Sequence, residues 1–87
     1  MIAKLKDGYE AIINDECLDD WEFLELLDEV DTGNGGAIVR VAKLLLGDDE
    51  LSKLKAHLRG DGKRVPATAM INALQELMES VGEAKNS

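Results

Sequence analysis

Residues 18–30 read Leu-Asp-Asp-Trp-Glu-Phe-Leu-Glu-Leu-Leu-Asp-Glu-Val, and their periodicity indicates a helical protein. Apolar side chains recur at the i, i+3, i+4 and i+7 positions of one helix face, and they are Phe23, Leu26, Leu27 and Val30. Asp19 or Asp20 can cap the start, and acids in the first turn complement the positive end of a helix. We therefore predict an amphipathic helix over residues 18–30.

The segment before this helix has the pattern of a β-hairpin. Asp7-Gly8 lies between two stretches with strand-like composition within residues 2–14. A two-residue type I′ turn needs positive φ angles, which Gly supplies and Asp tolerates. Because an isolated hairpin is only marginally stable in water, we expect its apolar side to pack on the helices.

Glycine residues divide the rest of the chain. Residues 32–36 end the first helix, and residues 37–46 form a helix that is apolar nearly all round, as in a central or interface helix. Residues 37–41 are rich in β-branched side chains and are also compatible with a strand. Gly47 suits the left-handed conformation that commonly follows the last helical residue.

Two further helices are predicted over residues 49–58 and 66–81. Asp48 caps the first of these, and Gly82 ends the second. The inner face of the last helix is predicted to carry Met70, Leu74, Leu77 and Val81.

These elements predict one small domain, residues 1–82, followed by a flexible tail, residues 83–87. A chain of 87 residues has room for a single domain. The expected fold class is mainly α, a small bundle of about four short helices with an N-terminal β-hairpin.

The chain is acidic, because 18 Asp and Glu against 10 Lys and Arg give a net charge of −8. Nucleic-acid affinity comes largely from Lys and Arg that displace counterions, so no nucleic-acid partner is expected. No apolar run approaches the ~20 residues of a membrane span, so no membrane partner is expected. The single cysteine excludes an internal disulfide framework and favours a reducing, intracellular compartment.

Residue types that support catalysis are scarce. Cys17 lies among acids that disfavour its thiolate, and His57 lies in a basic, exposed stretch, so we expect a buried thiol and a solvated imidazole. One His and one Cys cannot complete a four-ligand zinc site. The Gly-rich segments 33–36 and 60–65 lack the key residues of phosphate and calcium loops and are predicted to be turns. We expect no enzymatic activity, no cofactor and no metal site.

The apolar sector of the first two helices is wider than a small core requires. Residues 1–31 carry eleven acids and two bases, whereas residues 32–65 carry four acids and seven bases. Both features favour self-association or docking on another protein, and a solvated surface is the alternative. The candidate partner contacts, with core packing as the other interpretation, are Trp21, Phe23, Leu24, Ile38 and Val41.

Five short segments, taken in chain order, form a distinctive set. They are Leu5-Lys6-Asp7-Gly8-Tyr9, Leu18-Asp19-Asp20-Trp21-Glu22-Phe23-Leu24-Glu25-Leu26-Leu27, Leu44-Leu45-Leu46-Gly47, Leu54-Lys55-Ala56-His57-Leu58-Arg59 and Asp61-Gly62-Lys63-Arg64-Val65-Pro66. A Met-containing amphipathic helix follows the last of them. This ordered set resembles the small tail assembly chaperones of long-tailed bacteriophages (siphophages) and prophages, over most of the length of the chain.

The resemblance implies a non-enzymatic role in phage tail assembly. Such proteins coat the long, helical, aggregation-prone tape-measure protein and keep it soluble in the host bacterial cytoplasm. They are displaced as subunits of the major tail protein polymerise around it, and they are absent from the mature virion. Many also occur in a longer, frameshifted form, and Ala84-Lys85-Asn86 is compatible with the codons of a slippery heptamer.

Two other functions also fit the sequence. The acids from Asp15 to Asp31 are compatible with an acidic inhibitor that mimics nucleic acid, and the whole chain is compatible with a small regulatory helical module. Salt separates a mimic from a chaperone, because charge-based binding weakens steeply as ionic strength rises whereas binding through apolar helix faces weakens much less.

Overall fold

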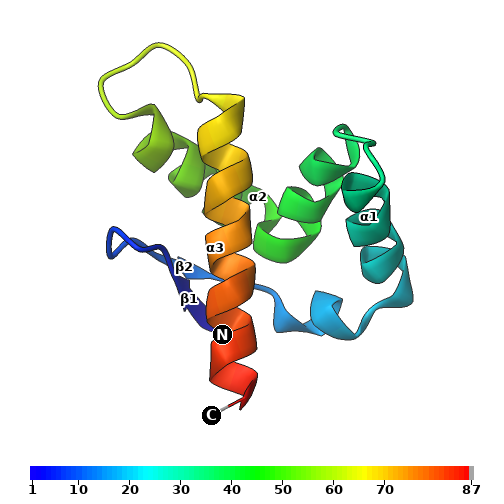
Figure 1. Ribbon diagram of the computed structural model, residues 1–87. Helices are drawn as coiled ribbons and strands as arrows, with labels where there is room; N and C mark the ends of the chain where they lie inside the picture. Colours follow the sequence, from blue (N-terminus) through cyan, green and yellow to red (C-terminus); the bar gives the residue numbers. More distant parts are fainter. Residues whose placement is uncertain (87) are drawn as a thin grey trace.

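The computed structural model describes the backbone of residues 1–86 and the side chains of residues 1–81. The elements, in chain order, are β1 (Ile2–Lys4), β2 (Glu10–Ile12), the 3-10 helix η1 (Asp15–Asp19), α1 (Trp21–Asp31), α2 (Ala37–Arg59) and α3 (Ala67–Asn86). Helix α3 crosses the molecule as a straight rod, with the hairpin on one side and α1 on the other (Figure 1). The predicted class, mainly α with an N-terminal hairpin, is confirmed.

Strands β1 and β2 form the predicted antiparallel hairpin, but its turn differs from the prediction. The register pairs Ile2 with Ile12, Ala3 with Ala11 and Lys4 with Glu10. The N–H of Leu5 donates to the carbonyl of Tyr9 (2.9 Å) and that of Gly8 to the carbonyl of Leu5 (3.0 Å), so residues 6–8 form a three-residue loop. Gly8 alone takes a positive φ (98°), while Oδ1 of Asp7 accepts the N–H of Tyr9 at 2.9 Å. The Asp7 side chain therefore fixes the turn, and its backbone is not left-handed.

Helix α1 begins three residues later than predicted. Oδ1 of Asn14 accepts the N–H of Glu16 at 3.2 Å and starts η1, so Leu18 belongs to this short 3-10 helix. Asp20 then takes an extended backbone and accepts the N–H of Glu22 at 2.9 Å, which confirms it as the cap. The apolar periodicity alone extends the helix back to Leu18. The caps at Asn14 and Asp20 instead divide this segment into η1 and α1.

The structure has three α-helices where we predicted about four. Residues 37–46 and 49–58 join into α2, which bends at Gly47 (φ 76°, ψ 174°), and the alternative of a strand over residues 37–41 is wrong. Essentially only glycine adopts this backbone conformation, so the interruption is at the predicted residue. The helix resumes at once, so Asp48 lies inside α2 instead of capping a separate helix. Both halves of α2 bury leucines in one shared core, which explains why the bend does not become a loop.

Helix α3 starts directly after Pro66, whose carbonyl accepts the N–H of Met70 at 3.1 Å. Three of the four residues of its predicted inner face, Leu74, Leu77 and Val81, are buried, and the fourth, Met70, is half-buried against the core. The helix continues past Gly82, where we predicted its end, since an interior glycine costs a helix only about 1 kcal/mol. The predicted flexible tail falls on residues 83–87, whose side chains, and in Ser87 also the backbone, lie outside the described part of the chain.

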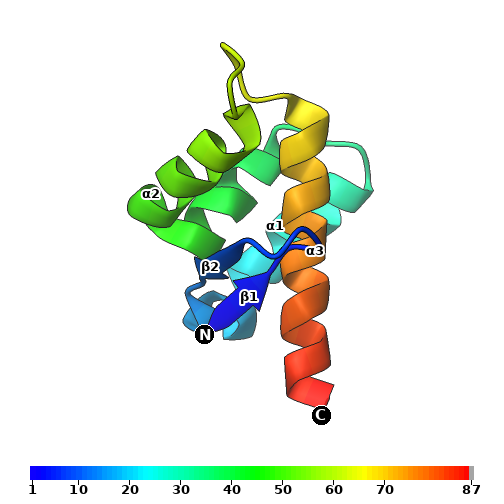
Figure 2. The same cartoon turned by 90° about the vertical axis from the view of Figure 1, so that its left-hand side faces the viewer.

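The core lies where the inner face of the hairpin meets α2 and α3. Its largest fully buried side chains are Phe23, Val41, Leu45, Leu54, Leu74 and Leu77. The free edge of β1 faces α3, where Oγ of Ser80 accepts the N–H of Lys4 (3.2 Å) and Oε1 of Glu76 accepts the N–H of Lys6 (2.8 Å). Figure 2 shows the hairpin crossing α3. Helix side chains therefore satisfy backbone groups that an edge strand otherwise leaves open.

Candidate partner-binding groove

Helix α1 and the first half of α2 lie side by side and leave a groove of about 860 Å³. The glycine-rich turn 33–36 reverses the chain between the two helices, as predicted for this segment. The apolar side chains that line the groove are Trp21, Leu24, Leu26 and Leu44. Trp21 is 73% exposed, Leu24 48% and Leu44 41%, so this apolar lining is open to solvent.

The five predicted partner contacts divide between groove and core. Trp21 and Leu24 line the groove. Phe23 and Val41 are fully buried, and Ile38 is half-buried against the core, so the structure places these three inside the molecule. On α1, Trp21 and Leu24 lie one turn apart on the outer face while Phe23 points inward, because a 100° step per residue separates neighbours in sequence.

Two groove residues were missed by the sequence reasoning. Leu44 was assigned only to a nearly all-apolar helix, and Leu26 was placed on the core stripe of the first helix, where it is in fact half-buried at the rim. The signal for Leu44 was its position beside the stripe of Val41 and Leu45, which leaves it on the outer side of α2. Finding it required knowing that α1 packs on this half of α2.

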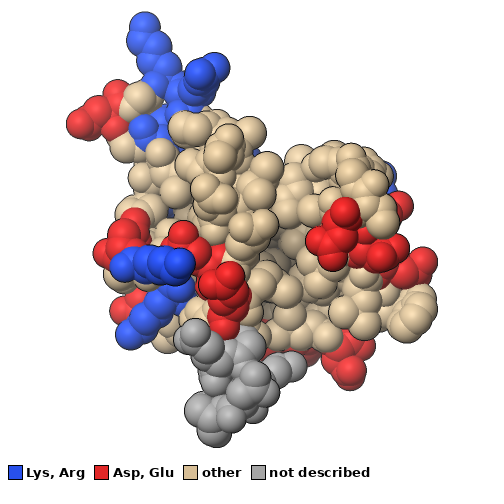
Figure 3. Space-filling view, in the orientation of Figure 1, with Lys and Arg blue, Asp and Glu red and all other residues tan. Residues whose placement is uncertain are grey.

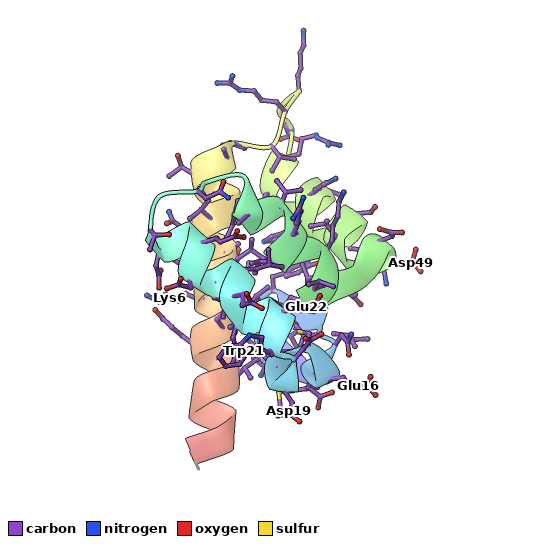
Figure 4. All side chains as sticks on the ribbon, turned by 90° about the vertical axis from the view of Figure 1, so that its right-hand side faces the viewer. Lys6, Glu16, Asp19, Trp21, Glu22 and Asp49 are labelled. Atoms are coloured by element: carbon purple, nitrogen blue, oxygen red, sulfur yellow. The ribbon has the colours of Figure 1, made fainter. Side chains whose placement is uncertain are left out.

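Charged side chains border the groove unequally. The α1 side carries five exposed acids, which are Asp20, Glu22, Glu25, Asp28 and Glu29. The α2 side carries two exposed bases, which are Arg40 and Lys43. Figure 3 shows acidic side chains over α1, and Figure 4 shows Trp21 and Glu22 at the start of α1, close to η1. The α1 wall of the groove therefore carries acids among its apolar side chains, and the α2 wall carries two bases beside Leu44.

A second exposed apolar surface lies on the outer face of the hairpin. Ile2 and Ile12 form a cross-strand pair and are 59% and 60% exposed, and Met1 beside them is 40% exposed. This surface lies outside the groove, which combines apolar lining with concavity and nearby charge. The groove is therefore the better candidate site.

His57 ties the hairpin turn to the second half of α2. Its Nε2 lies 2.8 Å from Oδ2 of Asp7, and its ring stacks on Tyr9 with centroids 4.3 Å apart. The N–H of Tyr9 and then the contact with His57 lower the pKa of Asp7. Burial, and then the charge of Glu50, raise the pKa of Tyr9. The predicted solvated imidazole is thus exposed but also makes a structural contact.

Cys17 is buried, as predicted. Burial first, and then the charge of Asp20, raise the pKa of its thiol, which disfavours the reactive thiolate. Within residues 1–81, no group of three or more His, Cys, Asp and Glu side chains is placed to hold a metal ion. No helix in the described part of the chain combines the length and the apolar character needed to cross a membrane.

Comparison with protein-family models, with curated proteins and with solved structures finds no match to this chain. The resemblance to tail assembly chaperones consequently depends on the five segments quoted above. The groove is an independent observation, because it follows from the packing of α1 on α2.

Proposed function

We propose that this protein is a non-enzymatic tail assembly chaperone of a siphophage or prophage. It binds the tape-measure protein in the host bacterial cytoplasm and keeps it soluble. Subunits of the major tail protein then displace it, so it is absent from the mature virion. The resemblance suggests the identity of the partner, and the groove between α1 and α2 offers a surface of suitable chemistry.

The observation that carries this proposal is the exposure of Trp21 in a groove with Leu24 and Leu44. Covering one large apolar side chain contributes about 1.5–3 kcal/mol, and tryptophan is enriched among residues that dominate binding energy. A groove between two helices suits a third, amphipathic helix, which is the expected structure of a tape-measure segment. The net charge of −8 keeps such a complex dispersed.

Co-expression with the proposed partner, a tape-measure protein, tests the proposal. Trp21→Ser combined with Leu24→Ser should move that partner from the soluble to the insoluble fraction, because the variant no longer covers its apolar stripe. The soluble fraction of the partner, measured by quantitative gel after centrifugation, reports the effect.

Ile71→Ser is the matched control, because Ile71 is 37% exposed on α3 and does not line the groove. It should keep the partner soluble to the same degree as the unmodified chain. Equal solubility of the partner with the double variant and with Ile71→Ser would contradict the proposal.

One observation favours the acidic mimic as a second candidate. All nine acids between Asp15 and Asp31 are exposed, and no base lies in this segment. Against it, Arg40 and Lys43 face the same groove, whereas a phosphate-like surface is uniformly negative. A mimic should lose its basic target on going from low to physiological salt, whereas the groove should hold its partner under both conditions.

A further inference from the structure

The charges that line the groove can select among partner helices, which its apolar side chains alone cannot do. Five acids from α1 and its cap line one wall of the groove, and two bases, Arg40 and Lys43, line the wall formed by α2. A purely apolar groove accepts any amphipathic helix in either direction. A groove with opposite borders favours a helix whose own borders carry the complementary charges.

The dimensions of the groove set the length of its occupant. Helix α1 has 11 residues, which at about 1.5 Å per residue span about 16 Å. Trp21 and Leu24 lie one turn apart along it, the spacing at which a second helix presents its own apolar stripe. A partner helix of about three turns covers this length.

We infer that the groove binds an amphipathic helix with a basic border next to α1 and an acidic border next to Arg40 and Lys43. This rests on the proposed function and specifies which helical segments of the tape-measure protein the chaperone engages. The two borders of a helix exchange sides when its direction is reversed. Unequal borders therefore also fix the direction of the bound helix relative to α1.

Designed peptides provide the probe. Each is a three-turn helix with the same leucine stripe and without tryptophan, so Trp21, the single tryptophan of the chain, reports binding by a shift of its emission to shorter wavelength. One peptide carries Lys on one border and Glu on the other, a second carries Gln on both, and a third carries Lys on both. The Lys/Glu peptide should bind about 3- to 10-fold more tightly than the Gln peptide at low salt.

Lys43→Glu tests the positive border directly. It should weaken the Lys/Glu peptide about 3- to 10-fold, because attraction to the acidic border becomes repulsion, and should strengthen the peptide with Lys on both borders. Lys55→Glu is the matched control, since Lys55 is exposed on the same helix, lies outside the groove and changes the net charge equally. Both positions are on the surface, so both variants should fold, and circular dichroism checks this.

Equal effects of Lys43→Glu and Lys55→Glu on every peptide would overturn this inference. If Leu24→Ser still abolished binding of the Gln peptide in that case, the proposed groove function would stand without its charge selectivity. A blue shift of Trp21 that grows with protein concentration in the absence of peptide would instead show that a second copy fills the groove, and would also overturn it.

Discussion

The carboxylate of Asp7 makes two contacts, with the N–H of Tyr9 at 2.9 Å and with Nε2 of His57 at 2.8 Å. Both favour its ionised form and lower its pKa from the ordinary value of 3.8. A carboxylate with a lowered pKa stabilises the folded state at pH values above 3.8, and this contribution is lost as the pH falls through the lower folded-state pKa. The contact that Asp7 makes between the hairpin turn and α2 therefore contributes a stability that depends on pH.

We predict that Asp7→Asn lowers the free energy of unfolding at neutral pH and reduces its decline below pH 3.8. Urea unfolding, followed by circular dichroism above and below that pH, measures both effects. Asp61→Asn, which changes an exposed acid in the loop before α3, is the control and should leave the acid-side decline as it is. An identical decline in the Asp7→Asn variant would contradict the role assigned to this carboxylate.

Gly47 determines the shape of α2, because its φ of 76° and ψ of 174° bend the helix without ending it. A Cβ at this position meets nothing within 4 Å, so the cost of a side chain is backbone strain alone. We predict that Gly47→Ala lowers the free energy of unfolding by about 1–3 kcal/mol. Chemical unfolding of the variant, compared with the unmodified chain, gives this value.

Gly35→Ala is the matched control for that prediction. Gly35 also has free space around its Cβ position, but its φ is not positive. Alanine there should be neutral or stabilise the protein by up to about 1 kcal/mol, because it restricts the unfolded chain. Similar decreases in the free energy of unfolding of both variants would show that the backbone conformation at Gly47 does not require glycine.

Periodicity predicted the elements and their inner faces well, and it failed where elements meet. The buried stripe of α3 agrees with the predicted one, because it is decided within one helix. Whether Gly47 ends a helix or bends it depends on one core shared by both halves of α2, which no local window contains. The same holds for the site, where Trp21 and Leu24 were predicted but Leu44 needed the packing of α1 on α2.

The excess of negative charge affects the stability of the whole molecule. The described residues contain one Lys–Glu ion pair, Lys53 with Glu50, and the contact of His57 with Asp7, which is an ion pair only when the imidazole is protonated; each includes at least one well-exposed side chain. Like charges on α1 lie three and four residues apart, which destabilises a helix by about 0.2–0.5 kcal/mol per pair. Repulsion therefore outweighs attraction between surface charges.

We predict that added sodium chloride raises the thermal unfolding midpoint by about 2–6 °C, because screening relieves about 0.5–1 kcal/mol of repulsion. Differential scanning calorimetry at low and moderate salt measures the change. The variant Glu25→Gln with Glu29→Gln should show a smaller rise, since it removes part of the repulsion in advance. A midpoint that falls with salt would mean that ion pairing dominates instead.

The hydrogen bonds from Lys4 and Lys6 to Ser80 and Glu76 also set an order of events during synthesis. The hairpin is synthesised before α3, so the acceptors for its outer edge, on Glu76 and Ser80, are not yet available when the strands are made. Until α3 supplies these acceptors, the outer edge of β1 has the open backbone groups through which edge strands pair with other chains. Docking of α3 closes this edge, so a helix that is synthesised after the hairpin protects the hairpin from pairing with other chains.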